Sequence, residues 1–127
     1  MKLRILDNSI RLRLTRTEVD KAARDGAVRG AVSFPDGSVF KYVFESSPAI
    51  VSSSASFSGN QLVVKMPRSE VLSWAATEQV SLAARQVLDD RQVLDILVEK
   101  DFACLAPRPD EDESDMFPHP GAGKDSC

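Results

Sequence analysis

The sequence has few of the residues from which disulfide frameworks, metal sites and phosphate loops are built. Its 127 residues include two cysteines, one histidine and six glycines. Cys104 and Cys127 are too few and too unevenly placed for a disulfide framework, which favours a reduced, cytoplasmic protein. The glycines are scattered singly, and no glycine-rich phosphate loop occurs. We therefore expect neither a disulfide-stabilised fold nor a P-loop enzyme.

Long apolar runs are also missing. The longest, such as Ile96-Leu97-Val98, are far shorter than the roughly 20 residues that a membrane-spanning helix needs. Met1-Lys2-Leu3-Arg4 is followed by alternating charge instead of an apolar segment, so no signal peptide is expected. The sequence predicts no association with a membrane.

Aromatic residues make up only 6% of the chain, and the isoelectric point is near 5.1. Both values argue against a nucleic-acid-binding surface. The charge is uneven, however: residues 1–52 hold nine basic and six acidic residues, whereas residues 101–127 hold two and seven. The basic first half and the acidic tail could attract each other, or the tail could be a solvated end.

What the sequence does contain is an internal repeat. An offset of 52 places residues 10–19 on 62–71 and Val28 on Val80, and an offset of 54 places residues 38–45 on 92–99. We expect repeat 1 (1–46) and repeat 2 (53–100) to pack about a pseudo-twofold axis. Val19 should then lie opposite Val71, and Ala23 opposite Ala75.

Each repeat is predicted to contain strand, turn, strand, helix, strand, turn and strand. The clearest strand has Ile10, Leu12 and Leu14 alternating with Arg11 and Arg13, which is typical of a half-buried antiparallel strand. Turn residues separate the strands, as in Pro35-Asp36-Gly37. The predicted strands are residues 2–6, 9–14, 28–34 and 38–45, and then 54–57, 61–66, 80–87 and 93–99.

A helix is predicted in the middle of each repeat. Thr15-Arg16-Thr17-Glu18 fits a capping box, and Gly26 is a natural stop. In the second repeat Ser69 is the expected cap, and Trp74 is expected in the core.

These elements predict an α+β fold made of tandem ββαββ units, with a mainly antiparallel curved sheet or a barrel-like closure and two helices. The barrel is slightly favoured. Residues 1–120 are expected to form one domain, in which residues 101–120 are an extended docked tail, and residues 121–127 are expected to be a frayed terminus.

The tail loses all periodicity and carries prolines at short spacing, so it should run extended. Phe102, Leu105 and Phe117 are spaced like apolar anchors that could hold it on the body. Cys104, His119, Glu111 and Glu113 are weak candidates for metal ligands, because no Cys-x-x-Cys or His-x-x-x-His occurs. A solvated acidic strand with a buried Cys104 is the favoured reading, and no cofactor is expected.

Two end segments carry a resemblance to a known family. Residues 5–14 contain Asn8-Ser9-Ile10-Arg11-Leu12-Arg13-Leu14, and residues 99–120 read Glu99-Lys100-Asp101-Phe102-x-Cys104-Leu105, then Glu111-Asp112-Glu113-x-Asp115-x-Phe117-Pro118-x-Pro120. This pattern resembles a family of small bacterial proteins of unknown function. The resemblance implies a bacterial cytosolic protein, without an activity to transfer.

Two functions remain open at this point. The first is a non-catalytic binding or scaffold module that acts through its sheet surface or its tail on an unknown protein partner, as a monomer or homodimer. The second is an anion- or phosphate-binding barrel protein or enzyme, in which basic residues on strand faces hold a small anionic ligand. The candidate anion-binding residues are Arg11, Arg13, Lys65 and Arg68.

Overall fold

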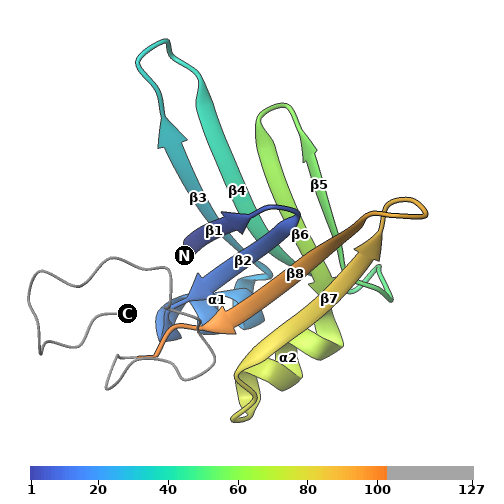
Figure 1. Cartoon of the computed structure of the whole chain (residues 1–127). Helices are drawn as coiled ribbons and strands as arrows, with labels where there is room; N and C mark the ends of the chain where they lie inside the picture. The colour runs from blue at the N-terminus through green and yellow to red at the C-terminus, as the bar shows by residue number, and fades with distance from the viewer. Residues whose placement is uncertain (103–127) are drawn as a thin grey trace, which may run out of the picture.

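The computed structural model describes residues 1–102, which form two helices and eight strands in the predicted order (Figure 1). The α+β class is confirmed. The elements are β1 (Lys2–Leu6), β2 (Ser9–Leu14), α1 (Arg16–Asp25), β3 (Ala27–Ser33), β4 (Val39–Ser47), β5 (Ser54–Ser58), β6 (Gln61–Pro67), α2 (Arg68–Ala76), β7 (Ser81–Val87) and β8 (Val93–Lys100).

The strands form two separate four-stranded sheets. Sheet 1 has the order β1-β2-β8-β7, and sheet 2 has the order β3-β4-β6-β5. The outer pairs in each sheet are antiparallel hairpins, and the central pairs β2–β8 and β4–β6 are parallel. Each sheet therefore combines one hairpin from the first half of the chain with one from the second half.

The expectation of a single curved sheet or a barrel-like closure is wrong. The edge strands β5 and β7 approach each other, but the backbone N–H of Ala55 donates to the side-chain Oε1 of Gln86, at 2.9 Å. A side chain thus satisfies a backbone donor that a closing strand ladder would have used. The two sheets remain separate, with edges on both sides.

Local signals in the sequence set the boundaries of α1. The Thr15 hydroxyl accepts from the Glu18 N–H at 3.3 Å, and the Thr15 N–H donates to the Glu18 carboxylate at 3.0 Å, which confirms the capping box. Gly26 has a φ of 86° and its N–H donates to the Ala22 carbonyl, so the helix ends there.

The predicted Ser69 cap of α2 is wrong. The helix begins two residues earlier than a Ser69 cap implies, at Arg68, so that Pro67 occupies the cap position and no side chain caps the helix. The fixed φ of proline, −58° here, suits the start of a helix without a side-chain hydrogen bond. Ser69 lies within the first turn instead.

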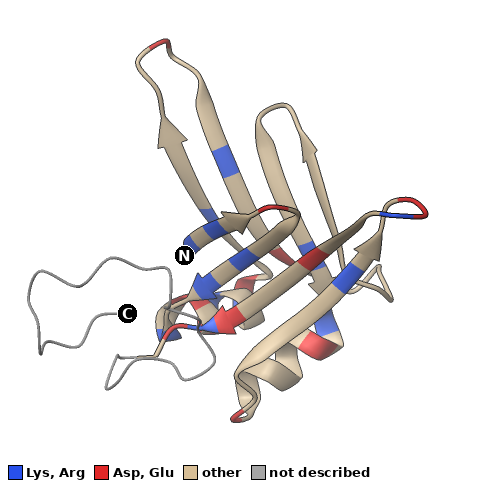
Figure 2. Ribbon diagram, in the orientation of Figure 1, with Lys and Arg blue, Asp and Glu red and all other residues tan. Residues whose placement is uncertain are grey.

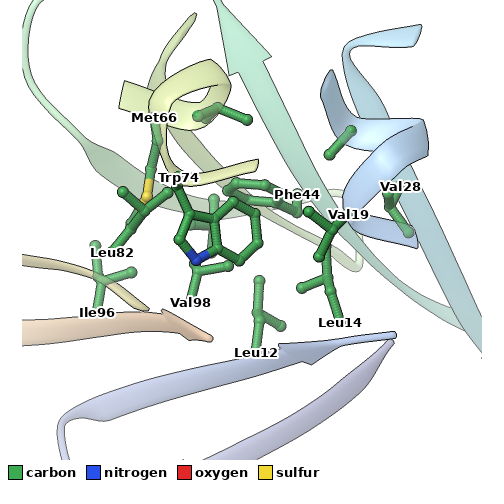
Figure 3. Close-up of a cluster of buried hydrophobic side chains, with 13 residues drawn as sticks. Leu12, Leu14, Val19, Val28, Phe44, Met66, Trp74, Leu82, Ile96 and Val98 are labelled. Carbon is green, nitrogen blue, oxygen red and sulfur yellow. The ribbon is translucent and has the colours of Figure 1, made fainter. Parts of the chain in front are cut away.

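One hydrophobic core joins both sheets and both helices (Figure 3). Trp74 is fully buried at its centre, as predicted, and its indole N–H donates to the Val80 carbonyl at 3.0 Å. The residues of the cluster are Leu12, Leu14, Val19, Ala22, Val28, Phe44, Val64, Met66, Val71, Trp74, Leu82, Ile96 and Val98. In each sheet, the face that carries these residues is called the inner face, and the opposite face is called the outer face.

The registers of the two sheets correspond. Leu12 pairs with Val98 in sheet 1, and the residues at the repeat offsets, Val64 and Phe44, pair in sheet 2. The aligned hairpins show the same agreement: Lys2 pairs with Arg13, and Ser54 pairs with Lys65.

One predicted equivalence is wrong. The sequence offset predicts that Val80 corresponds to Val28. In the structure Val28 pairs with Phe44, and the corresponding pair in sheet 1 is Leu82 with Val98, so Leu82 is the equivalent of Val28. Both residues are buried, whereas Val80 is exposed. A longer connection causes the shift, because residues 77–80 follow α2 where only Gly26 follows α1.

Candidate functional site

The outer face of sheet 1 carries a group of cations on β1 and β2. Side chains alternate along a strand, and the register places Lys2 opposite Arg13 and Arg4 opposite Arg11. These four residues therefore share one face, and Figure 2 shows blue segments on both of the neighbouring strands β1 and β2. The alternation in the sequence correctly indicated that Arg11 and Arg13 lie side by side on a strand face.

Carboxylates of the same sheet neutralise part of this group. The Arg13 guanidinium lies 2.7 Å from the Glu99 carboxylate, which the parallel β2–β8 register places opposite it, and Arg11 lies 3.8 Å from the same carboxylate. Lys2 pairs with Asp101 at 3.0 Å. Glu99 is only 7% exposed, so its bond to Arg13 is shielded from water. Within the described residues, Arg4 has no ion pair.

The structure separates the other two anion candidates from Arg11 and Arg13. Lys65 lies on the outer face of sheet 2, where its ammonium is 3.7 Å from the Glu45 carboxylate. Arg68 is exposed at the first residue of α2. Because the two outer faces lie on opposite sides of the shared core, the four candidates do not form one site.

A pocket of about 560 Å³ lies where the ends of β2 and β8 meet the two helices. Leu14, Val19 and Phe102 give it an apolar wall, and the charged residues Arg16 and Glu78 also line it. Lys100 also lines the pocket, but its ammonium donates to the Thr77 carbonyl at 2.8 Å and lies 5.9 Å from the centre of the Trp74 ring. Because charged residues of both signs line the pocket, it does not favour one chemical class of ligand.

The weak metal candidates Cys104, His119, Glu111 and Glu113 lie outside the described residues, as do the tail anchors Leu105 and Phe117. Phe102, the remaining anchor, is 56% exposed. Within residues 1–102, no group of histidine, cysteine, aspartate and glutamate side chains could hold a metal ion.

The inner face of sheet 2 carries an aromatic surface that the sequence analysis did not identify. The Phe40 ring lies 6.1 Å from the Tyr42 ring, centre to centre, and also 6.1 Å from the Phe57 ring. Phe57 is 62% exposed, and the neighbouring Val32 and Phe34 are 46% and 48% exposed. We call these residues, Val32, Phe34, Phe40, Tyr42 and Phe57, the distal face.

The distal face continues the core pattern beyond the part of sheet 2 that the helices cover. Phe40, Tyr42 and Phe44 alternate along β4, and only Phe44 is fully buried. This alternation is visible in the sequence. The approach of Phe57 is not, because it depends on β6 lying between β4 and β5.

Tyr42 anchors the base of the distal face. Its ring covers Gly30, the residue opposite it on β3: a Cβ at Gly30 would lie 2.3 Å from the ring carbon Cζ. The Tyr42 hydroxyl donates to the Met1 carbonyl at 3.3 Å. Glycine is required here because the aromatic ring occupies the space of a side chain.

Charge is nearly absent around the distal face. Residues 30–40 contain one charged residue, Asp36, and residues 52–64 contain none. The strands of sheet 2 carry the charged residues Arg29, Lys41, Glu45 and Lys65, but these alternate with the inner-face residues and therefore lie on the outer face.

A family described as a family of unknown function, DUF7009, matches residues 1–121. The chain belongs to this family. The predicted resemblance to a family without an established activity is thereby confirmed, and the match includes most of the acidic tail. Comparison with curated proteins and with solved structures found no match. Neither helix among the described residues is long and apolar enough to cross a bilayer.

Proposed function

We propose that this member of DUF7009 is a non-catalytic protein-binding module whose contact surface is the distal face. The observation that carries the proposal is the cluster of the half-buried Phe40 and Tyr42 with the exposed Phe57, on an inner sheet face almost without charge. Aromatic residues are enriched and charged residues depleted in the centres of protein interfaces. Contiguous exposed apolar surface on a soluble domain indicates an interaction site.

The distal face is also suited to binding because it is pre-organised. Phe40 and Tyr42 project from the central strand β4, which has ladder partners on both sides. The Tyr42 ring is fixed by its contact with Gly30 and by its hydroxyl. Rigid aromatic side chains lose little conformational entropy on binding, so more of the contact energy appears as affinity.

The experiment is capture of a partner from the native cell extract, with chemical crosslinking and mass spectrometry. Phe57→Ser removes the most exposed ring of the distal face and should abolish capture of the partner. Val87→Ser is the matched control, because Val87 is an apolar residue on sheet 1 that is at least as exposed as Phe57 (72% against 62%). If Phe57→Ser and the wild type captured the same proteins, the distal face would not be the binding surface.

A second function, anion binding, is favoured by the register that places Arg4 opposite Arg11. Like charges directly opposite each other destabilise a strand pair, and a bound anion would relieve this. In a thermal-shift screen, phosphate or polyphosphate should raise the melting temperature of the wild type but not that of Arg4→Ala. Equal shifts in both proteins would exclude this site.

The corresponding registers support a tandem duplication of one ββαββ unit, with copies at residues 1–46 and 53–100. The ion pairs correspond as well: Arg13–Glu99 in sheet 1 matches Lys65–Glu45 in sheet 2. The low cysteine count supports the proposed cytoplasmic location. A bacterial origin rests on the resemblance described above.

The docked tail stays a proposal, supported by a family match that extends to residue 121. Truncation after Lys100 should lower the melting temperature in low and high salt alike, because apolar anchors would hold the tail. A truncated chain that melted like the full chain would contradict this.

A further inference from the structure

The strand edges of the two sheets are not equally protected. Edge strands present unpaired backbone groups, and proteins shield them with charge, short length or a covering group. On β1 the edge is five residues long and carries Lys2 and Arg4. On β5 the Gln86 side chain takes the Ala55 N–H, and the neighbouring β7 carries Arg85.

The edge of β3 has the least protection. Like β7, it runs for seven residues and carries a single charge, here Arg29, but β7 approaches β5, whereas β3 has only β4 as a neighbour in the described sheet. The side chains at the free end, Ala31 to Phe34, are all exposed.

The hairpin geometry shows which backbone groups face outward. The Phe34 N–H donates to the Ser38 carbonyl at 2.9 Å, so Phe34 directs its polar groups toward β4. Antiparallel pairing alternates, and Val32 and Gly30 therefore also face β4. The N–H and C=O groups of Arg29, Ala31 and Ser33 point away from the sheet.

Ala27 has the same orientation, but it is buried, so the accessible outward groups are those of Arg29, Ala31 and Ser33. We propose that this edge pairs with the β3 edge of a second copy of the chain, antiparallel and centred on Ala31. Among the antiparallel registers, the one centred on Ala31 pairs all three of these residues: Ala31 faces Ala31, and Arg29 faces Ser33 of the second copy. Such pairing forms roughly six backbone hydrogen bonds. It joins two copies of sheet 2 into one continuous eight-stranded sheet with both inner faces on the same side.

Side chains in this register are compatible on both faces. On the outer face, Arg29 lies opposite the neutral Ser33, so no like charges meet. On the inner face, Val32 lies opposite Gly30 of the second copy, against the Tyr42 ring that covers that glycine. Phe34 lies opposite Val28 of the second copy, beside its core. The two exposed apolar residues at the end of β3 thus gain apolar neighbours.

The proposal goes beyond the binding function and does not depend on it. The dimer covers Val32 and Phe34 at the β3 side of the distal face, whereas Phe40 and Phe57 lie one and three strands away from the paired edge and remain accessible. Loss of partner capture in Phe57→Ser and loss of the dimer through Ala31 are separate results.

The test introduces a charge at Ala31, positive in one variant and negative in another. The mass of each protein is then measured by light scattering coupled to size-exclusion chromatography over a concentration series. Wild-type chain should double in mass as concentration rises. Ala31→Lys and Ala31→Glu each place like charges opposite each other on the twofold axis and should raise the dissociation constant about tenfold or more. An equimolar mixture of the two variants should form the dimer again.

Ala83→Lys is the matched control. Ala83 is an exposed alanine on the other long edge strand, β7, and this variant should dimerise like the wild type. Circular dichroism checks that each variant is folded. We expect the variants to fold because the Ala31 side chain is exposed. A wild-type chain that stays monomeric at every concentration, a dimeric Ala31→Lys, or a mixture that stays monomeric would each overturn the proposal.

Discussion

The Trp74 indole meets the Phe44 ring edge-on, with ring centres 6.2 Å apart and an angle of 81° between the rings. Phe44 comes from the first half of the chain and Trp74 from the second, and both are fully buried. This contact lies at the centre of the core that joins the two sheets (Figure 3).

Trp74→Ala should lower the free energy of unfolding by about 3–5 kcal/mol, because it leaves a large cavity and removes the hydrogen bond to Val80. Urea unfolding followed by circular dichroism measures the loss. Leu72→Ala on the same helix is the control, since Leu72 is exposed and should cost less than about 1 kcal/mol. Equal losses in the two variants would contradict the central role of Trp74.

Gly30→Ala should destabilise the protein by about 1–3 kcal/mol, because the new Cβ displaces the Tyr42 ring and its hydroxyl bond. In a Tyr42→Ala background the same substitution should be neutral or slightly stabilising, since alanine suits a strand better than glycine. A double-mutant cycle in urea measures this coupling. Additive effects would show that the ring does not restrict Gly30.

The two corresponding ion pairs should differ in their contribution to stability. Glu99→Ala breaks a buried pair with Arg13 and should cost about 3 kcal/mol. Glu45→Ala breaks the more exposed pair with Lys65 and should cost about 0–1 kcal/mol. High salt screens this exposed pair, so the loss caused by Glu45→Ala should become smaller still. Denaturant unfolding of both variants compares them directly; similar losses would mean that burial does not separate the two pairs.

Glu18 should contribute to the acid sensitivity of the fold. Burial acts to raise its pKa, but hydrogen bonds from the N-terminal ammonium and from Thr15, with the charge of the ammonium, outweigh it and hold the pKa below the ordinary value of 4.5. Since the unfolded chain binds this proton more tightly, the stabilisation is complete above that value and is lost as the pH falls through the folded-state pKa.

Glu18→Gln should therefore lower stability at neutral pH, by about 1 kcal/mol for the weakened cap, and the gap to the wild type should close as the solution is acidified below the ordinary value. Melting temperatures across a pH series give the measurement. Glu78→Gln, at an exposed position, should follow the wild type throughout. A constant gap for Glu18→Gln would show that its ionisation is not linked to folding.

Local signals predicted the elements well, and long-range pairing was not predictable in the same way. Thr15, Glu18 and Gly26 define α1 through contacts within a few residues. The parallel pairing of Leu12 with Val98 joins opposite ends of the described chain, and no local pattern specifies it. The expected barrel failed for this reason.

The same limit applies to the candidate site. Alternation placed Arg11 and Arg13 on one face, but their partner Glu99 depends on the β2–β8 register. Likewise, Phe40 and Phe57 approach each other only because β6 lies between their strands. The distal face is therefore a property of the tertiary structure.

Each sheet is built from one hairpin of each half of the chain, and this determines how the two halves can fold. Neither residues 1–46 nor residues 53–100 contain a complete sheet, so a separated half has no interior of its own to fold around. A chain cut in the connector after β4 should then reassemble by fragment complementation. Under the duplication proposed above, a single ββαββ unit would have been an obligate dimer, and duplication and fusion of its gene would have made folding independent of concentration.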